Sequence, residues 1–409
     1  MNFSWRKNCR ICNNPDLIKY FDFGDMPLAN AFKKPDQKEE LFFPQQMLFC
    51  PKCANSQLSV VVDPKIMFSN YLYFSSVSKT FQKHCETMAN HFTNLFTEKI
   101  KCLDIASNDG CLLKEFQKLG NEVIGVEPAK NISNQANSNN IPTICEFWGK
   151  SAALKVNRKV GNVDLVTATN VFAHVDEIHD FVKNVYDVLD DNGLFMIEFP
   201  YMKNLVEDCE FDTIYHEHLS YFLAKPIKIL LEMHRMKIVD LSLQKIHGGS
   251  LRVLAAKDTN KTHQVDNSVE KFIHDEESLG LHNIEAYEKL EKSAKKIKED
   301  FISAINEKIN KGKKIIGYGA SAKGNVFLNY CKIDSDKISF IVDDTKAKQR
   351  LIYAGTKIPI VDFSNIEKER PEYIVILPWN FAKEIMDKTK DFKQKGGKYI
   401  TAIPELKII

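Results

Sequence analysis

Ile100-Lys101-Cys102-Leu103-Asp104-Ile105-Ala106-Ser107-Asn108-Asp109-Gly110 decides the fold, because it predicts a buried strand followed by a loop of small and polar residues. Apolar residues then recur at helical spacing over residues 112–119. A second predicted strand, residues 122–127, ends in Glu127. Later strands are expected over residues 163–168 and 193–199. This alternation of strands and helices predicts an α/β fold with a doubly wound sheet.

The loop and the acid after the second strand indicate a nucleoside-containing cofactor. Small residues let a ligand approach the backbone, and an acid at that position can accept hydrogen bonds from both ribose hydroxyls. The loop lacks the third glycine of a dinucleotide fingerprint. The Asp104…Asp109-Gly110…Glu127 series instead resembles class I S-adenosylmethionine-dependent methyltransferases, with another nucleotide as the alternative. The resemblance implies that Glu127 holds the ribose and that residues 106–110 face the methionine part. The cofactor-binding candidates are Asp104, Ala106, Ser107, Asn108, Asp109, Gly110, Glu127 and Asn170.

Two Cys-x-x-Cys pairs near the amino terminus predict a metal site. Cys9 and Cys12 form the first pair, and Cys50 and Cys53 form the second. Four thiolates complete a tetrahedral zinc shell and leave no open position, so the predicted Zn²⁺ is structural. The alternatives are a chance group of reduced thiols and a zinc ribbon that binds nucleic acid.

Composition limits the class of protein. A chain of 409 residues is too long for one ordinary core, which predicts two or three domains. The net charge of +2 arises from 56 basic and 54 acidic residues without a concentrated basic face, which argues against nucleic acid as a partner. No apolar run approaches the roughly 20 residues of a membrane-spanning helix. We therefore expect a cytoplasmic protein with no membrane partner, and the sequence indicates no oligomeric state.

Residues 212–221, Asp-Thr-Ile-Tyr-His-Glu-His-Leu-Ser-Tyr, are dense in groups that hold or move protons. A helix would place Tyr215 and His218 on one face, whereas an extended segment would separate them. His218 supported by Glu217 is the candidate base, because a carboxylate beside an imidazole raises its basicity. Tyr215 and His174 are candidates to hydrogen-bond a developing oxyanion. A metal-binding His-x-His is the alternative, and His216 is expected to be structural.

Two further segments carry candidate site residues. The hydroxyls of residues 71–78, Tyr-Leu-Tyr-Phe-Ser-Ser-Val-Ser, could line a cleft between domains, and Tyr73 is a catalytic candidate. Tyr71 falls on the same side in an extended segment, so spacing does not separate the two tyrosines. Residues 247–252, His-Gly-Gly-Ser-Leu-Arg, suit either an anion site or a structural turn.

The carboxyl-terminal part begins with one or two charged helices over residues 266–313. A strand and a glycine loop follow, and Gly317, Gly319 and Ala322 match a dinucleotide pattern. A nucleotide diphosphate, a nicotinamide dinucleotide and a purely architectural role remain open for this loop. The substrate-binding candidates are Ser321, Lys323 and Asn325.

The order of these motifs resembles the sugar-nucleotide C-methyltransferases that build branched deoxysugars. The shared motifs are the paired Cys-x-x-Cys knuckles, Tyr-x-Tyr-x-Ser-Ser-Val-Ser, Ser-Asn-Asp-Gly, Asn-Val-x-Ala-His, Tyr-His-Glu-His-x-Ser-Tyr-Phe, His-Gly-Gly-Ser-Leu-Arg and Gly-Tyr-Gly-Ala-x-Ala-Lys-Gly-Asn. The resemblance implies a zinc-binding domain (1–72), a methyltransferase domain (73–262) and a helical connector with a Rossmann-like domain (263–409). It also implies base chemistry at His218 and Glu217. The chain departs from the family at Ala106 and over residues 348–355.

The predicted reaction is methylation of the carbon next to a ketone, C3 of a nucleotide-linked 4-keto-6-deoxysugar. Such a C–H bond is only weakly acidic, so the enzyme must remove the proton and stabilise the enolate oxygen. The density of proton-handling residues favours this reaction over O-methylation, which is the first alternative. The others are a nicotinamide-dependent oxidoreductase that uses the Gly317 loop and a zinc module that acts on RNA.

Overall fold

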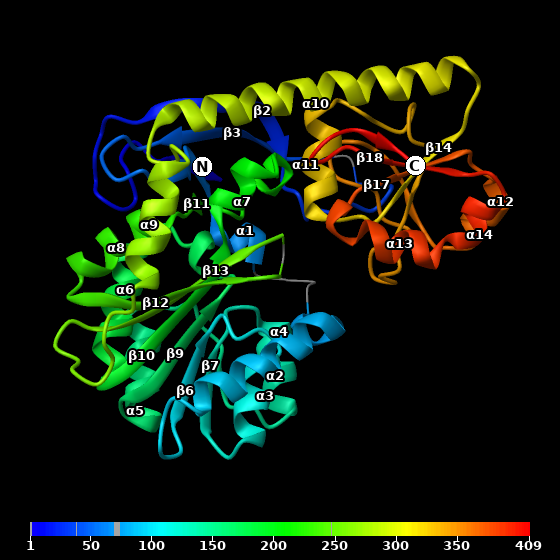
Figure 1. Cartoon of the computed structure of the whole chain (residues 1–409). Coiled ribbons are helices and arrows are strands. Elements are labelled where there is room, and N and C mark those ends of the chain that lie inside the picture. Colours follow the sequence, from blue (N-terminus) through cyan, green and yellow to red (C-terminus); the bar gives the residue numbers. More distant parts are fainter. Residues whose placement is uncertain (1, 38, 69–73, 247) are drawn as a thin grey trace.

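The computed structural model describes residues 2–37, 39–68, 74–246 and 248–409. Its sheets form three groups along the chain: two small antiparallel sheets, a central seven-stranded sheet and a six-stranded sheet at the carboxyl end (Figure 1). In the described ranges, no helix combines the length and apolar character needed to cross a membrane.

The amino-terminal sheets are antiparallel. The smaller one pairs β1 (Phe3–Trp5) with β5 (Val60–Val62). The larger one contains β2 (Ile18–Pro27), β3 (Phe42–Phe49) and β4 (Ser56–Leu58), and the short helix α1 (Pro64–Phe68) follows β5. A fourth strand, β11 (Ser220–Tyr221), pairs with β4 although it lies far along the chain. The end of the predicted proton-transfer stretch is therefore built into the amino-terminal sheet.

The central sheet has the strand order β12-β13-β10-β9-β6-β7-β8. Six of its strands run in the same direction, and β13 is antiparallel to both of its neighbours, β10 and β12. The run of buried apolar residues in β9 is typical of a strand that helices cover on both faces. The strands are β6 (Lys101–Ile105), β7 (Glu122–Val126), β8 (Thr143–Ile144), β9 (Val163–Thr169), β10 (Leu189–Pro200), β12 (Met236–Gln244) and β13 (Ser250–Lys257).

The helices around this sheet confirm the prediction of a doubly wound α/β fold. They are η1 (Ser75–Val77), α2 (Lys79–Thr93), α3 (Cys111–Lys118), α4 (Lys130–Ser138), α5 (Lys150–Val160), η2 (Phe172–His174), α6 (Ile178–Val188), α7 (Met202–Glu207), η3 (Phe211–Thr213) and α8 (Ala224–Met233).

A long helix leads to the carboxyl-terminal sheet. After α9 (Ser268–Ser278), helix α10 (Ile284–Asn310) runs from the amino-terminal strands to the last sheet (Figure 1). Its buried Tyr287 packs on Tyr20 of β2, whereas its buried Phe301 packs on Phe327 near the other end. The predicted charged helices of residues 266–313 are thus confirmed, and α10 joins the outer domains.

The carboxyl-terminal sheet has the order β16-β15-β14-β17-β18-β19, and only β19 is antiparallel to its neighbour. The strand β15 is short, since only Ile341 and Val342 pair with β14. The elements are β14 (Ile315–Tyr318), α11 (Ala322–Tyr330), β15 (Ile341–Val342), β16 (Ile360–Val361), α12 (Asn365–Glu369), β17 (Tyr373–Ile376), η4 (Trp379–Phe381), α13 (Ala382–Lys388), α14 (Lys390–Gln394), β18 (Lys398–Thr401) and β19 (Lys407–Ile408).

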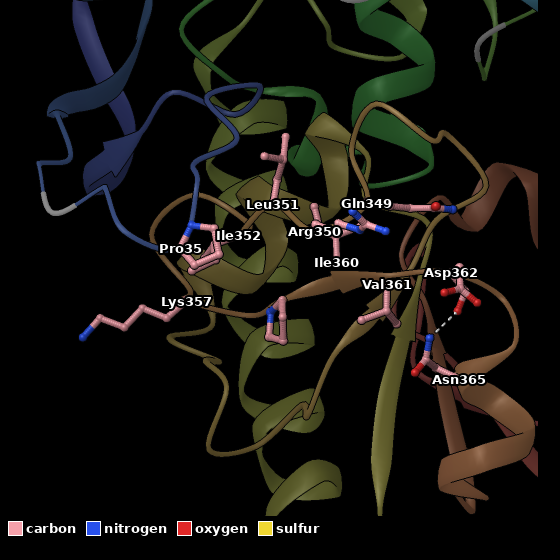
Figure 2. Close-up of a pocket in the computed structure, with 11 residues that line it drawn as sticks. Pro35, Gln349, Arg350, Leu351, Ile352, Lys357, Ile360, Val361, Asp362 and Asn365 are labelled. Carbon is pink, nitrogen blue, oxygen red and sulfur yellow. Dashed lines mark hydrogen bonds between the residues drawn. The ribbon is translucent and has the colours of Figure 1, made fainter.

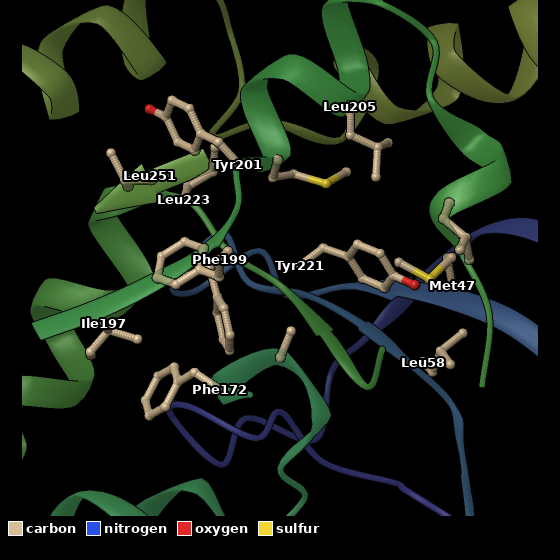
Figure 3. Packing of buried hydrophobic residues seen from close by; sticks show 14 of the residues in the cluster. Met47, Leu58, Phe172, Ile197, Phe199, Tyr201, Leu205, Tyr221, Leu223 and Leu251 are labelled. Carbon is tan, nitrogen blue, oxygen red and sulfur yellow. The ribbon is translucent and has the colours of Figure 1, made fainter. Parts of the chain in front are cut away.

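The amino-terminal and central domains share one hydrophobic core. Met47 and Leu58 from the amino-terminal strands belong to the same buried cluster as Phe199 and Tyr221 of the central domain (Figure 3). Within this shared core, Arg10 is only 1% exposed. Its Nε donates to Asp176 Oδ1 at 2.8 Å, and its Nη1 donates to the carbonyls of Leu58 and Leu219, each at 2.9 Å.

The four predicted zinc ligands converge in the amino-terminal domain. The Sγ atoms of Cys9, Cys12, Cys50 and Cys53 all lie within 4.8 Å of one another. The Sγ distances of 3.5 Å for Cys9–Cys53 and Cys12–Cys50 approach the edge of a tetrahedron with Zn–S bonds of about 2.3 Å. The residues present therefore fit a closed Zn²⁺ shell.

We expect one zinc ion per chain, and its removal should destabilise the amino-terminal domain by several kcal/mol, because these ligands hold a segment with little core of its own. Zinc analysis before and after chelation, with thermal unfolding followed by circular dichroism, measures this. Cys50→Ser should reproduce the loss, whereas Cys145→Ser, which changes an exposed thiol outside the cluster, should not. A metal-free protein with unchanged unfolding would contradict the assignment.

Arg10→Met should lower the free energy of unfolding by about 3 kcal/mol, because the carbonyls of Leu58 and Leu219 would lose a buried donor. Chemical denaturation gives this value. Lys19→Met removes an exposed ion pair with Asp22 and should change the stability by less than about 1 kcal/mol. Equal effects of the two substitutions would show that the buried arginine has no special role.

Candidate active site

The loop after β6 turns sharply, through several residues with left-handed backbone. Ala106, Asn108 and Gly110 all have left-handed backbone, with φ of 56°, 50° and 78°. The Glu127 carboxylate organises this loop, since it accepts from the backbone N–H of Asn108 at 3.0 Å and of Ala129 at 2.8 Å. The departure at Ala106 therefore has a cost: a left-handed alanine is strained by about 1 kcal/mol, whereas glycine is not.

The segment before α2 covers this loop. The backbone N–H of Ser75 donates to Asn108 Oδ1 at 2.9 Å, and that of Ser76 donates to Asp109 Oδ2 at 3.2 Å. The side chains of Asn108 and Asp109 are thus partly used to attach η1. Tyr73, predicted as a catalytic residue, lies outside the described residues.

Several buried polar atoms around the loop fit a polar cofactor. Ser107 Oγ, Asp109 Oδ1 and Asn170 Oδ1 are buried and lack a hydrogen-bond partner within the described ranges. Native proteins rarely leave such atoms unsatisfied, so a ligand is the natural partner. Burial raises the pKa of Asp104 to about 7, although Thr167 Oγ1 donates to it at 2.7 Å and opposes the rise. These residues would hold S-adenosylmethionine at the carboxyl ends of β6, β7 and β9.

The proton-transfer stretch is neither a helix nor a long strand. Residues 214–219 form an irregular turn in which the His218 N–H donates to the Tyr215 carbonyl at 2.9 Å. The turn stacks the Tyr215 ring on the His218 ring, with centroids 4.2 Å apart. His174, at the end of η2, lies with its ring centroid 4.9 Å from that of His218. The structure therefore brings three of the predicted catalytic residues together.

The backbone orients His218. Its Nδ1 lies 2.9 Å from the Thr213 carbonyl, which can only accept, so Nδ1 carries the proton and the neutral ring has its lone pair on Nε2. The Glu217 carboxylate accepts from Asn30 Nδ2 of the amino-terminal domain at 2.6 Å. The sequence named Glu217 as the support of His218, and it missed Thr213, whose role depends on its carbonyl rather than its side chain.

The neighbouring histidines differ in environment. Burial lowers the pKa of His174 to about 4, while the backbone carbonyls of Glu217 and Asn170 oppose the shift. His174 is therefore neutral at pH 7. Burial also lowers the pKa of His216 to about 4, and its Nε2 donates to the Pro44 carbonyl at 3.2 Å. His216 is 1% exposed, in agreement with the expected structural role.

The carboxyl-terminal loop contacts the catalytic domain through its side chains. Lys323 Nζ lies 3.5 Å from Glu210 Oε2 and 4.6 Å from the centre of the Trp379 ring. Ser321 Oγ accepts from the Gly324 N–H at 3.1 Å and caps α11. Asn325 corrects a prediction, because it is fully buried and its Nδ2 donates to the Ala354 carbonyl at 2.8 Å. Ligand binding stays a prediction for Ser321 and Lys323.

A carboxylate at the end of β15 also holds the glycine loop in place. Asp343, at the end of β15, accepts from the Ala320 N–H at 2.7 Å and from the Thr345 N–H at 2.8 Å. Lys348 donates to the Ala320 carbonyl at 2.8 Å and lies 3.8 Å from Asp343. Asp343 and Lys348 therefore fix this loop, much as Glu127 fixes the loop after β6. In the segment of residues 247–252, His247 lies outside the described residues, and Arg252 Nη2 pairs with the buried Glu198 at 2.7 Å.

The structure has a smaller and a larger cavity that differ in whether predicted site residues line them. The smaller one lies at the carboxyl ends of the central strands, and its lining includes His218, Glu210, Thr213, Ser220 and Tyr221. A larger cavity of about 560 Å³ lies between Pro35 and loops of the carboxyl-terminal domain around residues 349–352 and 357–362 (Figure 2). None of the predicted site residues lines the larger cavity. The smaller cavity is lined by the predicted base His218, and also by Glu210, which the sequence did not indicate.

Comparisons with known proteins agree with this organisation. Three family models match in order: a zinc binding domain over residues 9–68, a methyltransferase domain over 77–239 and a C-methyltransferase C-terminal domain over 245–404. The chain is 31% identical over 409 residues to the C-methyltransferase NovU of Streptomyces niveus. This alignment covers 98% of this chain and 96% of NovU.

Other matches are partial. A ubiquinone biosynthesis O-methyltransferase of Pelagibacter ubique is 25% identical over 197 residues, covering 43% of this chain and 75% of that protein. The solved structure of the PH0226 protein from Pyrococcus horikoshii OT3 aligns with a TM-score of 0.36 and 17% identity, over 45% of this chain and 94% of that one. On the full-length match and the three domain models, the chain belongs to the S-adenosylmethionine-dependent C-methyltransferases that carry an amino-terminal zinc-binding domain.

Proposed function

We propose that this enzyme methylates the carbon next to the ketone of a nucleotide-linked keto-deoxysugar, C3 of a 4-keto-6-deoxysugar. The observation that supports this reaction best is the orientation of His218, whose Nδ1 is bonded to the Thr213 carbonyl at 2.9 Å. A base with one defined basic nitrogen suits the removal of a proton from carbon, whereas a hydroxyl already carries a lone pair. The family match to a C-methyltransferase agrees with attack by carbon.

In the proposed mechanism, His218 Nε2 removes the proton from the carbon next to the ketone. The electron pair of that C–H bond moves toward the carbonyl, and the ketone oxygen gains negative charge. Tyr215, whose ring lies next to that of His218, would donate a hydrogen bond to this oxygen, whereas the single N–H of neutral His174 is directed at backbone carbonyls. Loss of one such donor typically costs about 2.7–4 kcal/mol of transition-state stabilisation.

The cofactor residues lie at the same edge of the sheet as the catalytic residues. Asn170 follows β9, and His174 ends the short helix η2 four residues later. When bound, S-adenosylmethionine supplies the electrophilic methyl group. The acids Asp104 and Glu127 are buried in the half of the site proposed for the cofactor, where a bound cation would favour their charged forms. Methyl transfer then requires the carbon nucleophile at about 3–3.5 Å.

The nucleotide part of the substrate is proposed to contact the carboxyl-terminal domain. Ser321 and Lys323 lie at the start of α11, a helix whose first N–H groups favour negative charge. Lys323 also contacts Glu210 of the catalytic domain, so this helix start faces the active site. This placement supports a substrate that reaches both domains.

His218→Asn should lower kcat by about 10²–10⁴-fold, because asparagine cannot accept the proton. Binding of S-adenosylmethionine, measured by calorimetry, should not change, since the cofactor loop is built from other residues. His216→Asn is the matched control and should retain much of kcat, because His216 bonds a backbone carbonyl outside the cavity. Near-normal turnover of His218→Asn would exclude His218 as the base.

A panel of 4-keto-6-deoxyhexoses linked to uridine, thymidine, guanosine or cytidine diphosphate tests the substrate class. We expect incorporation of a labelled methyl group on carbon, detected by mass spectrometry and NMR. Without cofactor, the enzyme should exchange the substrate C3 proton for deuterium, and His218→Asn should not. Methyl transfer to oxygen without this exchange would contradict the proposed reaction.

A further inference from the structure

A carboxylate that the proposed mechanism does not use lies in the active-site cavity. Glu210 is 4% exposed and lines the same cavity as His218. Its Oε1 has no hydrogen-bond partner among the residues that the structure describes. Ser220 Oγ, which also lines the cavity, is buried and equally without a partner there. Because an unsatisfied buried carboxylate oxygen is costly, a polar group that enters the cavity is its natural partner.

The surroundings hold this carboxylate in place. Gly248 has a φ of 95°, and a Cβ at this position would lie only 2.6 Å from Glu210 Oε1. The main chain therefore packs directly against the carboxylate. On the other side, Lys323 Nζ lies 3.5 Å from Oε2. Trp379, over which Lys323 lies, donates from Nε1 to Asp212 at 2.9 Å. The carboxyl-terminal domain thus orients Glu210.

The cavity has room for about one water-sized group. A whole sugar ring does not fit there, but one hydroxyl that projects from a ring does. A hydroxyl donates one hydrogen bond and accepts others, so it can satisfy both Glu210 Oε1 and Ser220 Oγ. This matches the two kinds of unsatisfied atom in the cavity.

We propose that Glu210 is a substrate-binding residue whose carboxylate accepts a hydrogen bond from one ring hydroxyl of the sugar, with Lys323 as its positioning residue. This inference rests on the proposed function and deepens it, because it makes the enzyme select sugars that carry that hydroxyl. The hydroxyl also orients the ring toward His218 in the same cavity.

The ionisation of Glu210 agrees with this role. Burial raises its pKa to about 7, which Lys323 opposes and Asp212 and Asp208 reinforce. The other titratable groups in the lining of the cavity are His218, Tyr201 and Tyr221, and burial raises the pKa of both tyrosines above the ordinary value. Below pH 7 the carboxylate gains a proton and becomes a weaker hydrogen-bond acceptor. The value of 1/KM should therefore decrease as the pH is lowered through 7. Lys323→Met should move this change to higher pH, because the cation that favours the charged form is gone.

The test compares Glu210→Gln with the parent enzyme, using the panel member with the highest turnover and its 2-deoxy and 3-deoxy counterparts. For the hydroxylated substrate, Glu210→Gln should lower kcat/KM about 10- to 100-fold, mainly through KM. For one of the two deoxy counterparts, the variant and the parent should agree within about threefold. Glu210→Asp should recover part of the loss, and the pH dependence of 1/KM near 7 should vanish in Glu210→Gln.

Asp208→Asn, which removes an exposed carboxylate two residues away, is the matched control and should leave KM unchanged at a pH well above 7, where Glu210 is charged with or without Asp208. Binding of S-adenosylmethionine by calorimetry establishes that each variant is folded. A KM within twofold of the parent in Glu210→Gln, or equal losses for all three sugars, would overturn the inference while the proposed function stands. Absence of turnover with every panel member would remove both.

Discussion

The structure depends on satisfying the backbone of a buried segment that has little regular structure. Residues 210–220 include the predicted base His218, and most of this segment lies outside regular helices and strands, so its carbonyls need partners from elsewhere. The amino-terminal domain supplies the partners. Gln45 Nε2 donates to the Ile214 carbonyl at 2.7 Å, and Arg10 Nη1 donates to the Leu219 carbonyl at 2.9 Å. The zinc-binding domain thus holds the turn that contains His218 in its conformation, and its predicted metal has a structural role.

The sequence could predict features that depend on local pattern. Parallel strands follow from apolar runs, and the acids Asp104 and Glu127 follow from their places at strand ends. The four cysteines follow from their spacing alone. The sequence could not predict which group orients His218. Every residue has a backbone carbonyl, and only the conformation of the turn brings the carbonyl of Thr213 next to the His218 ring. The contact of Asn30 with Glu217 joins segments 187 positions apart and leaves no local signal.

The carboxyl-terminal loop shows the same limit. Its glycine pattern predicted a strand, a tight loop and a helix, and all three are present. The pattern did not reveal that Asp343 accepts a hydrogen bond from the loop backbone, or that Asn325 is buried. The pairing of Lys323 with Glu210 is similarly hidden, since the two residues belong to different domains. A glycine motif therefore predicts the backbone path, whereas its ligand depends on side chains that arrive from elsewhere.

The long helix α10 restricts where residues can be inserted into or deleted from this chain. One face of α10 packs on the amino-terminal strands through Tyr287 and on the last domain through Phe301. Each residue added to a helix turns everything beyond it by about 100°. An insertion between these two contacts would rotate the last domain about the helix axis and carry Lys323 away from Glu210. Surface loops can change in length, but the number of residues in α10 between Tyr287 and Phe301 is fixed by the orientation that the last domain must keep.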